Sequence, residues 1–202
     1  MHVAAMTPEL LLALTGFALA TLFSPGPNNL MLMASGANFG LRRTVPHLLG
    51  VATGFPLMAA AVGLGLGALF QSWPPAETIL TVLAAAIHLW LACKIANAAP
   101  PKERAAEGRP LTYLQATAFQ WVNPKAWFMA IGAMSAYAAS GGAPQVLAVA
   151  AVFLGFGMCS ALTWTTVGTQ LRRVLTSRAR LRAFNWTMAA LLVASLIPML
   201  RA

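Results

Sequence analysis

The chain has 202 residues, of which 59% are hydrophobic and 8% are charged, and its mean hydropathy is +0.72. Soluble domains carry about 25% charged residues, so this composition excludes an ordinary soluble protein and indicates an integral membrane protein. The formal net charge of +9 does not indicate a nucleic-acid-binding protein, because the basic residues gather in particular connections between apolar segments.

Six apolar segments have close to the roughly 20 residues that a bilayer-spanning helix needs. They cover about residues 8–38, 45–70, 78–98, 113–137, 145–170 and 183–200. The sequence therefore predicts an all-α integral membrane protein with six transmembrane helices, forming a single transmembrane domain over residues 1–202. A polar, proline-containing linker at about 99–112 divides it into one half of about residues 1–98 and another of about 113–202.

The basic residues indicate how the spans are oriented. Eleven of the thirteen lie at or within alternate connections: Arg42, Arg43, Lys94, Lys102, Arg104, Arg109, Arg172, Arg173, Arg178, Arg180 and Arg182. Short loops rich in lysine and arginine stay in the cytoplasm, so we expect a multi-pass protein of the bacterial inner membrane with both termini outside. The same residues would attract anionic lipid headgroups.

The first span is interrupted by Ser24-Pro25-Gly26-Pro27-Asn28-Asn29. Proline removes a backbone N–H and clashes with the preceding turn, so a helix breaks or kinks there. A broken backbone at membrane depth survives only where protein or a polar cavity satisfies its freed groups. We expect Ser24 to cap a new helix that begins at Pro25.

A second interruption, Asn123-Pro124-Lys125, lies in the fourth span. Here Asn123 is expected to cap a helix that begins at Pro124. Because each half has an odd number of spans, a duplicated half inserts in the opposite direction. Proline-interrupted spans at matching places in inverted halves are the best sequence pointer to a transporter binding site.

Lys125 is the strongest single candidate for function. A lysine at mid-bilayer costs about 2.5–3.5 kcal/mol on insertion scales and is functional by default. Together with the helix starts at Pro25 and Pro124, its ammonium is suited to a carboxylate, while Asn28 and Asn29 are expected to receive an amino group. The predicted substrate-binding residues are Ser24, Pro25, Gly26, Pro27, Asn28, Asn29, Asn123, Pro124 and Lys125.

No aspartate or glutamate lies within a predicted span, so a neutral amino acid suits the site better than a cationic one. Proton exchange would then fall to Lys125 or to His88 in the third span. A packed, hydrogen-bonded role for His88 is an equal alternative, and His2 and His47 are expected to be peripheral.

Two rival functions remain open. A membrane thiol or electron carrier would need paired cysteines near the breaks, whereas Cys93 and Cys159 are far apart in the sequence. The other rival is a non-transporting membrane scaffold. No hydrolase, metalloprotease or nucleotide-binding motif occurs, so we expect neither an enzyme nor a metal or cofactor.

The chain resembles the LysE/RhtB family of bacterial amino-acid exporters over essentially its whole length. The resemblance rests on residues 24–29, on Gly40 with the basic residues after it, on Gly50 and Gly54, and on residues 91–96 and 119–126. It implies an inner-membrane exporter of amino acids or close derivatives, driven by the proton motive force. Many relatives have aspartate after Pro-Gly-Pro, where this chain has Asn28, which removes a titratable group. The variant with two asparagines is similar to members that export cysteine and O-acetylserine.

The sequence thus predicts a secondary transporter that exports a small neutral amino acid. Its expected partners are that substrate, protons and membrane lipid, with a homodimer as an open alternative.

Overall fold

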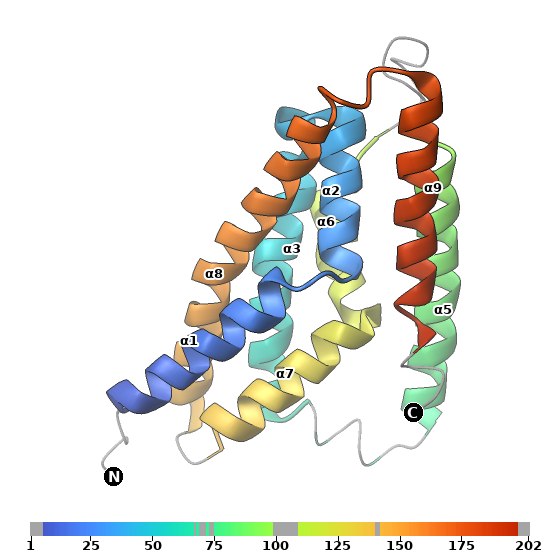
Figure 1. Ribbon diagram of the computed structural model, residues 1–202. Coiled ribbons are helices and arrows are strands. Elements are labelled where there is room, and N and C mark those ends of the chain that lie inside the picture. Colours follow the sequence, from blue (N-terminus) through green and yellow to red (C-terminus); the bar gives the residue numbers. More distant parts are fainter. Residues whose placement is uncertain are drawn as a thin grey trace.

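The computed structural model describes residues 6–66, 68, 72, 75–98, 109–139 and 142–197, and every regular element in these ranges is a helix (Figure 1). In chain order these are α1 (Pro8–Phe23), α2 (Pro27–Phe39), α3 (Leu41–Ala61), the π-helical turn η1 (Val62–Leu66), α5 (Pro75–Ala96), α6 (Tyr113–Phe119), the 3₁₀ turn η2 (Gln120–Val122), α7 (Pro124–Tyr137), α8 (Gly142–Leu171) and α9 (Arg178–Ala194). The predicted all-α class is confirmed. Most of the predicted linker, residues 99–108, lies outside the described residues.

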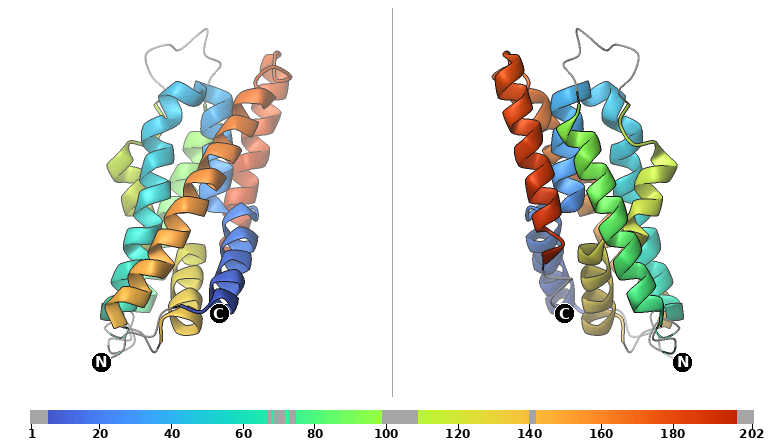
Figure 2. Two further views of the ribbon diagram at one scale, coloured as in Figure 1. Left: turned by 90° about the vertical axis from the view of Figure 1, so that its left-hand side faces the viewer. Right: turned by 90° about the vertical axis from the view of Figure 1, so that its right-hand side faces the viewer.

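The helices form one elongated bundle, which Figure 2 shows from two sides. Helices α2, α3, α5, α8 and α9 run along its length, whereas α1 and α7 are inclined to them in its lower half (Figure 1). Helix α2 packs on α8, α3 packs on both α8 and α6, and α5 packs on α9. The start of α1 and the end of α9 lie toward the same end of the bundle (Figure 1).

Three helices are long and apolar enough to cross a membrane: Leu41–Leu66, Thr78–Ala96 and Gly142–Leu171. The bent pair α1 and α2 makes a fourth candidate if it is counted as one span. Helix α9 has 17 residues, and α6 and α7 have only 7 and 14 on either side of their break. The structure therefore confirms a multi-span helical membrane protein, and the six-span inverted arrangement stays a prediction.

Both the interior and the outer surface are rich in large apolar side chains. Large apolar side chains face outward, including Leu12 and Leu114, each 74% exposed. Polar side chains are buried and bond across helices instead. Asn38 on α2 donates from Nδ2 to Asn185 Oδ1 on α9 at 2.8 Å, and the reverse hydrogen bond is 3.2 Å long. An apolar exterior over such polar contacts is what a lipid solvent favours.

Glycines bring the central helices into backbone contact. A Cβ atom added at Gly36 on α2 would meet the backbone carbonyl of Thr165 on α8, and one added at Gly168 would meet that of Met33. Gly54 on α3 is similarly placed against α6, where an added Cβ would lie 2.8 Å from the Cα of Thr117. Small residues at such interfaces let helices approach closely in lipid, where dispersion contacts drive association.

We expect Gly168→Ala to destabilise the protein by about 1–3 kcal/mol, because the added methyl group meets backbone that cannot move aside. Thermal unfolding of the detergent-solubilised protein measures this. Gly155→Ala on the same helix is the matched control, because no atom lies within 4 Å of its added Cβ. Equal melting temperatures for the two variants would contradict the close α2–α8 contact.

Candidate functional site

The break between α1 and α2 is produced by two residues that each precede a proline. Ser24 (φ −66°, ψ 145°) and Gly26 (φ −177°, ψ 177°) are both extended, as expected because proline disfavours the α conformation in the residue before it. The two helix axes differ by 52°. The prediction of a helix beginning at Pro25 with Ser24 as its cap is wrong. Helix α2 begins at Pro27 with Gly26 as N-cap, because Pro27 keeps Gly26 out of the helical conformation.

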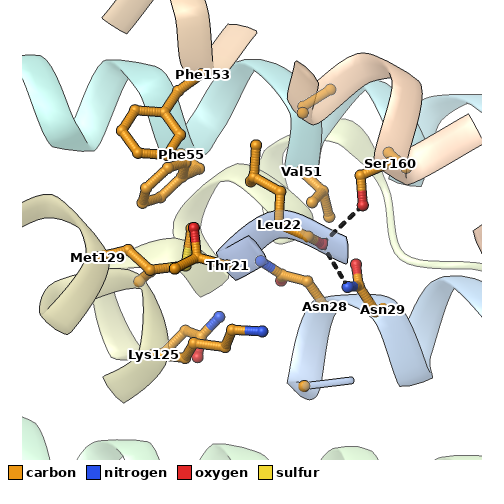
Figure 3. Close-up of a pocket in the computed structure, with 16 residues that line it drawn as sticks. Thr21, Leu22, Asn28, Asn29, Val51, Phe55, Lys125, Met129, Phe153 and Ser160 are labelled. Carbon is orange, nitrogen blue, oxygen red and sulfur yellow. Dashed lines mark hydrogen bonds between the residues drawn. The ribbon is translucent and has the colours of Figure 1, made fainter. Parts of the chain in front are cut away.

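The carbonyl groups freed at this break are satisfied by side chains. Asn29 Nδ2 donates to the carbonyl oxygens of Leu22 at 2.7 Å and Ser24 at 2.8 Å. Ser160, which projects from α8, donates its hydroxyl to the same Leu22 oxygen at 2.7 Å (Figure 3). The broken backbone is therefore stabilised from both α2 and α8, as its depth requires.

The second break separates α6 from α7. The chain passes from α6 through η2 to Asn123, which is extended (φ −95°, ψ 108°), and α7 begins at Pro124 as predicted. Trp127 Nε1 donates to the Trp121 carbonyl at 2.9 Å across this break. The Asn123 side chain makes no capping hydrogen bond, and within the described residues its Oδ1 is buried without a partner.

The two breaks meet in the interior of the bundle. Asn28, at the start of α2, exchanges two hydrogen bonds with Gln120 of η2: Asn28 Nδ2 donates to Gln120 Oε1 at 2.8 Å, and Gln120 Nε2 donates to Asn28 Oδ1 at 3.1 Å. Gln120 Nε2 also donates to the carbonyl of Ala116 at 2.9 Å. This paired carboxamide contact fixes the first turn of α2 against the end of the α6 segment.

The second link between the breaks is made by Lys125. Its Nζ donates to Ser24 Oγ at 2.8 Å, to the Ser24 carbonyl at 3.0 Å and, more weakly, to the Pro25 carbonyl at 3.5 Å. A Cβ atom at Gly26 would lie 2.8 Å from Lys125 Cδ and 3.0 Å from Nζ, so the absence of a side chain there gives the lysine its place. The ammonium thus lies beside the N-terminus of α2.

All three of these partners are uncharged oxygens. Among the side chains that the structure describes, Glu9 at the start of α1 is the only carboxylate, and it is exposed. A half-buried ammonium held by neutral oxygens, next to the positive end of a helix, attracts an anionic group.

A pocket lies where the breaks meet, between α1, α2, α3, α7 and α8, and holds about 490 Å³ of empty space, including space open to solvent (Figure 3). Its polar lining residues are Thr21, Asn28, Asn29, Asn123, Lys125 and Ser160. Its apolar lining residues are Leu22, Val51, Ala52, Phe55, Ala126, Met129, Phe153 and Ala161, with Gly26 and Gly157.

The structure brings together all nine residues that the sequence suggested for binding. Five of them line the pocket: Gly26, Asn28, Asn29, Asn123 and Lys125. The others form its frame, since Ser24 and Pro25 hold the Lys125 ammonium and Pro27 and Pro124 begin α2 and α7. Their roles in substrate binding stay predictions.

His88 lies away from this group. It is fully buried on α5, its Nδ1 bonds the Ala84 carbonyl at 2.7 Å, and its ring packs on Phe119 with centroids 5.1 Å apart. It is absent from the pocket lining. The expectation that His47 is peripheral is wrong. The side chain of His47 is only 2% exposed, because it lies on the buried face of α3. His2 lies outside the described residues.

Nothing in the sequence indicates that several other residues belong to this site. Ser160 is one hydroxyl among several on α8, and Phe55, Phe153 and Met129 look like ordinary apolar residues of their spans. Gln120 lies within residues 119–126, which carry the family resemblance, but nothing in the sequence indicates that its side chain contacts Asn28. Only the packing of helices distant in sequence identifies these residues.

The two cysteines are free and exposed, on α5 and α8 respectively, and neither lines the pocket. This placement gives no support to the thiol-carrier alternative, which needs paired thiols at the breaks.

Comparison with known proteins assigns the sequence of this chain to a family. Residues 19–199 match the sequence model of the LysE type translocators. Cysteine/O-acetylserine efflux proteins of Escherichia coli (strain K12) and Shigella sonnei (strain Ss046) are each 30% identical over 197 residues, which cover 93% of this chain and 96% of the relative. No solved structure matches the chain significantly. Its span-length helices and these matches over nearly the whole chain show that this protein is a member of the LysE type translocator family of amino-acid exporters.

Proposed function

We propose that this protein is a secondary transporter that exports a small neutral amino acid or a close derivative across the bacterial inner membrane, driven by the proton motive force. The observation that carries the proposal is the Lys125 ammonium, which lies against the N-terminus of α2 inside a pocket formed by two broken helices.

The substrate carboxylate would bind between Lys125 and the first turn of α2. The backbone N–H groups of Asn28 and Asn29 belong to that turn, where an α-helix supplies no acceptor for them. Helix N-termini bind carboxylates through such groups. A carboxylate is also a stronger partner for the ammonium than the Ser24 and Pro25 oxygens that hold it in this structure. The start of α7 at Pro124 would add to the same positive field.

The substrate amino group would bind at the Asn123 carboxamide. Its Oδ1 is a buried acceptor without a partner in the described part of the chain, and Asn123 lines the pocket. The carboxamides of Asn28 and Asn29 already bond Gln120 and the α1 carbonyls, so we assign these residues a role through their backbone and through the shape of the break. With no carboxylate in the pocket lining, the side chain of the substrate would not be cationic.

The names of the relatives agree with this substrate class, since cysteine and O-acetylserine are both small neutral zwitterions. The direction of transport is taken from the same relatives, which are efflux proteins.

The path of the chain supports the six-pass topology of two inverted halves in a single domain. The broken pairs α1–α2 and α6–α7 run through the bundle in opposite directions (Figure 1). The start of α3, which carries Arg42 and Arg43, and the segment after Leu171, which carries Arg172 and Arg173, lie at one end of the bundle (Figure 1). We propose that this end faces the cytoplasm and that both termini lie outside.

Lys125 is the first group that we propose for proton coupling. Its ammonium could leave the Ser24 oxygens in the neutral form and return protonated, so that its two states differ in affinity for the carboxylate. His88 is the second proposed group, and because it contacts Phe119 next to Gln120 it would act through the second break.

Lys125→Met should lower export of the substrate at least tenfold, because the variant keeps the bulk of the side chain and removes its charge and donors. Efflux from preloaded proteoliposomes measures this. Lys94→Met is the matched control, since Lys94 is exposed near the end of α5 and packs over Trp90. Unchanged efflux by the Lys125 variant would refute the proposed carboxylate site.

Asn123→Leu should raise the KM for export about tenfold, since a hydrogen bond to a charged group is worth about 1.5–3 kcal/mol. Helix α7 should persist, because the Asn123 side chain does not cap it. Asn97→Leu, at the exposed end of α5, controls for loss of an asparagine elsewhere. A KM equal to that of the unaltered protein would remove Asn123 from the site.

Replacing Cys93 and Cys159 together by serine should leave amino-acid efflux within twofold, because both thiols lie outside the pocket. The same efflux assay tests this. A complete loss of activity in the folded double variant would favour the thiol-carrier alternative.

A further inference from the structure

The pocket has a polar side and an apolar side. Figure 3 shows Phe55 and Phe153 across the pocket from Asn28 and Asn29, with Met129 on the side of the aromatic rings. The three apolar residues come from α3, α8 and α7, and each is less than 10% exposed. A substrate held by its carboxylate and amino group on the polar side would direct its side chain toward them.

The aromatic wall is held in place by ring contacts. Phe55 and Phe153 pack edge to face, with centroids 5.0 Å apart and planes at 89°. Phe153 is braced in turn by Phe17 of α1, at 6.3 Å and 82°. Edge-to-face pairs are favourable beyond their buried area, so these rings resist displacement. The wall therefore limits the length of the side chain that the pocket accepts.

The apolar side offers almost no hydrogen bonds to a substrate. The Thr21 hydroxyl in the lining donates to the Phe17 carbonyl at 2.7 Å, so it keeps only its acceptor capacity for a substrate. A hydroxyl, amide or charged group that meets Phe55, Phe153 or Met129 would lose its water without gaining a partner from them. Met129 is apolar and adaptable in shape, which suits aliphatic and sulfur-containing side chains.

We infer that Phe55, Phe153 and Met129 form a side-chain subsite that selects amino acids with a compact apolar side chain, of the size of valine, leucine or methionine, over their polar isosteres. The inference rests on the proposed export function and names the substrate class within it.

Valine and threonine are the sharpest pair of probes, because they have nearly the same shape and differ by one methyl-to-hydroxyl exchange. We expect the unaltered protein in proteoliposomes to export valine with a kcat/KM about 10- to 100-fold above that for threonine, the range in which apolar pockets discriminate such isosteres. Equal export of the two would overturn the subsite and leave the export function standing. Failure to export any neutral amino acid would instead overturn the proposed function, and the subsite with it.

Met129→Gln tests the subsite directly, because it nearly conserves side-chain volume and places a hydrogen-bonding group on the apolar side. The valine-to-threonine ratio should fall at least fivefold. Met158→Gln is the matched control, since Met158 is partly buried on α8 but is not part of the lining, and its ratio should not change. An unchanged ratio in a folded, exporting Met129 variant would contradict the assignment.

Phe55→Ala tests the size limit separately, so that the conclusion does not depend on one variant folding. Removing the ring should raise phenylalanine export relative to valine at least tenfold. Phe128→Ala is the control, because Phe128 on α7 is 67% exposed on the outer surface. If phenylalanine stays excluded in an exporting Phe55 variant, the wall does not set the limit.

Discussion

The contact between Lys125 and Ser24 joins two helices that are each broken at proline, and the rest of the interior is arranged around it. A transmembrane helix that loses backbone hydrogen bonds has no water to replace them. In this protein Lys125 of α7 donates to the carbonyl of Ser24 at the first break, beside the hydrogen bonds from Asn29 and Ser160, and Gln120 of η2 pairs with the side chain of Asn28. The two interruptions are therefore joined where they meet.

The unbroken helices make that meeting possible. Helix α8 touches α2 backbone to backbone at Gly36 and Gly168, and α3 does the same with α6 at Gly50 and Gly54. These close contacts set the depth of the α2 and α6 ends, since a side chain at any of the four positions would force the helices apart. Ser160, on the same α8 scaffold, then reaches the Leu22 carbonyl. The position of these helix ends and the Ser160 hydrogen bond thus depend on small residues that are not themselves part of the pocket lining.

In the proposed site, the balance of charges would favour zwitterions. A half-buried ammonium with only neutral partners is stabilised by any anion that reaches it, whereas a second cationic group in the substrate would find no carboxylate in the lining. The remaining discrimination falls to the shape and polarity of the wall opposite. In the proposed site the polar groups would bind the amino acid, and the apolar groups would select among its side chains.

The sequence by itself determined the class of protein and the position of both breaks, and it singled out Lys125 as a candidate, because proline chemistry and the cost of a charge in lipid are local properties. It also identified Asn123 and Pro124 as a helix start. It misplaced the start of α2 by two residues, since two prolines in succession compete and the second one prevails by holding Gly26 extended. Only the tertiary structure decided that Asn28 pairs with Gln120 and that Phe55, Met129 and Phe153 share a wall, because these residues are separated in the chain by up to roughly a hundred positions and meet only through helix packing. It likewise decided that His88 packs on Phe119 at the end of α6 and that His47 is interior, because the face of a helix on which a histidine is buried depends on which neighbour that helix packs against.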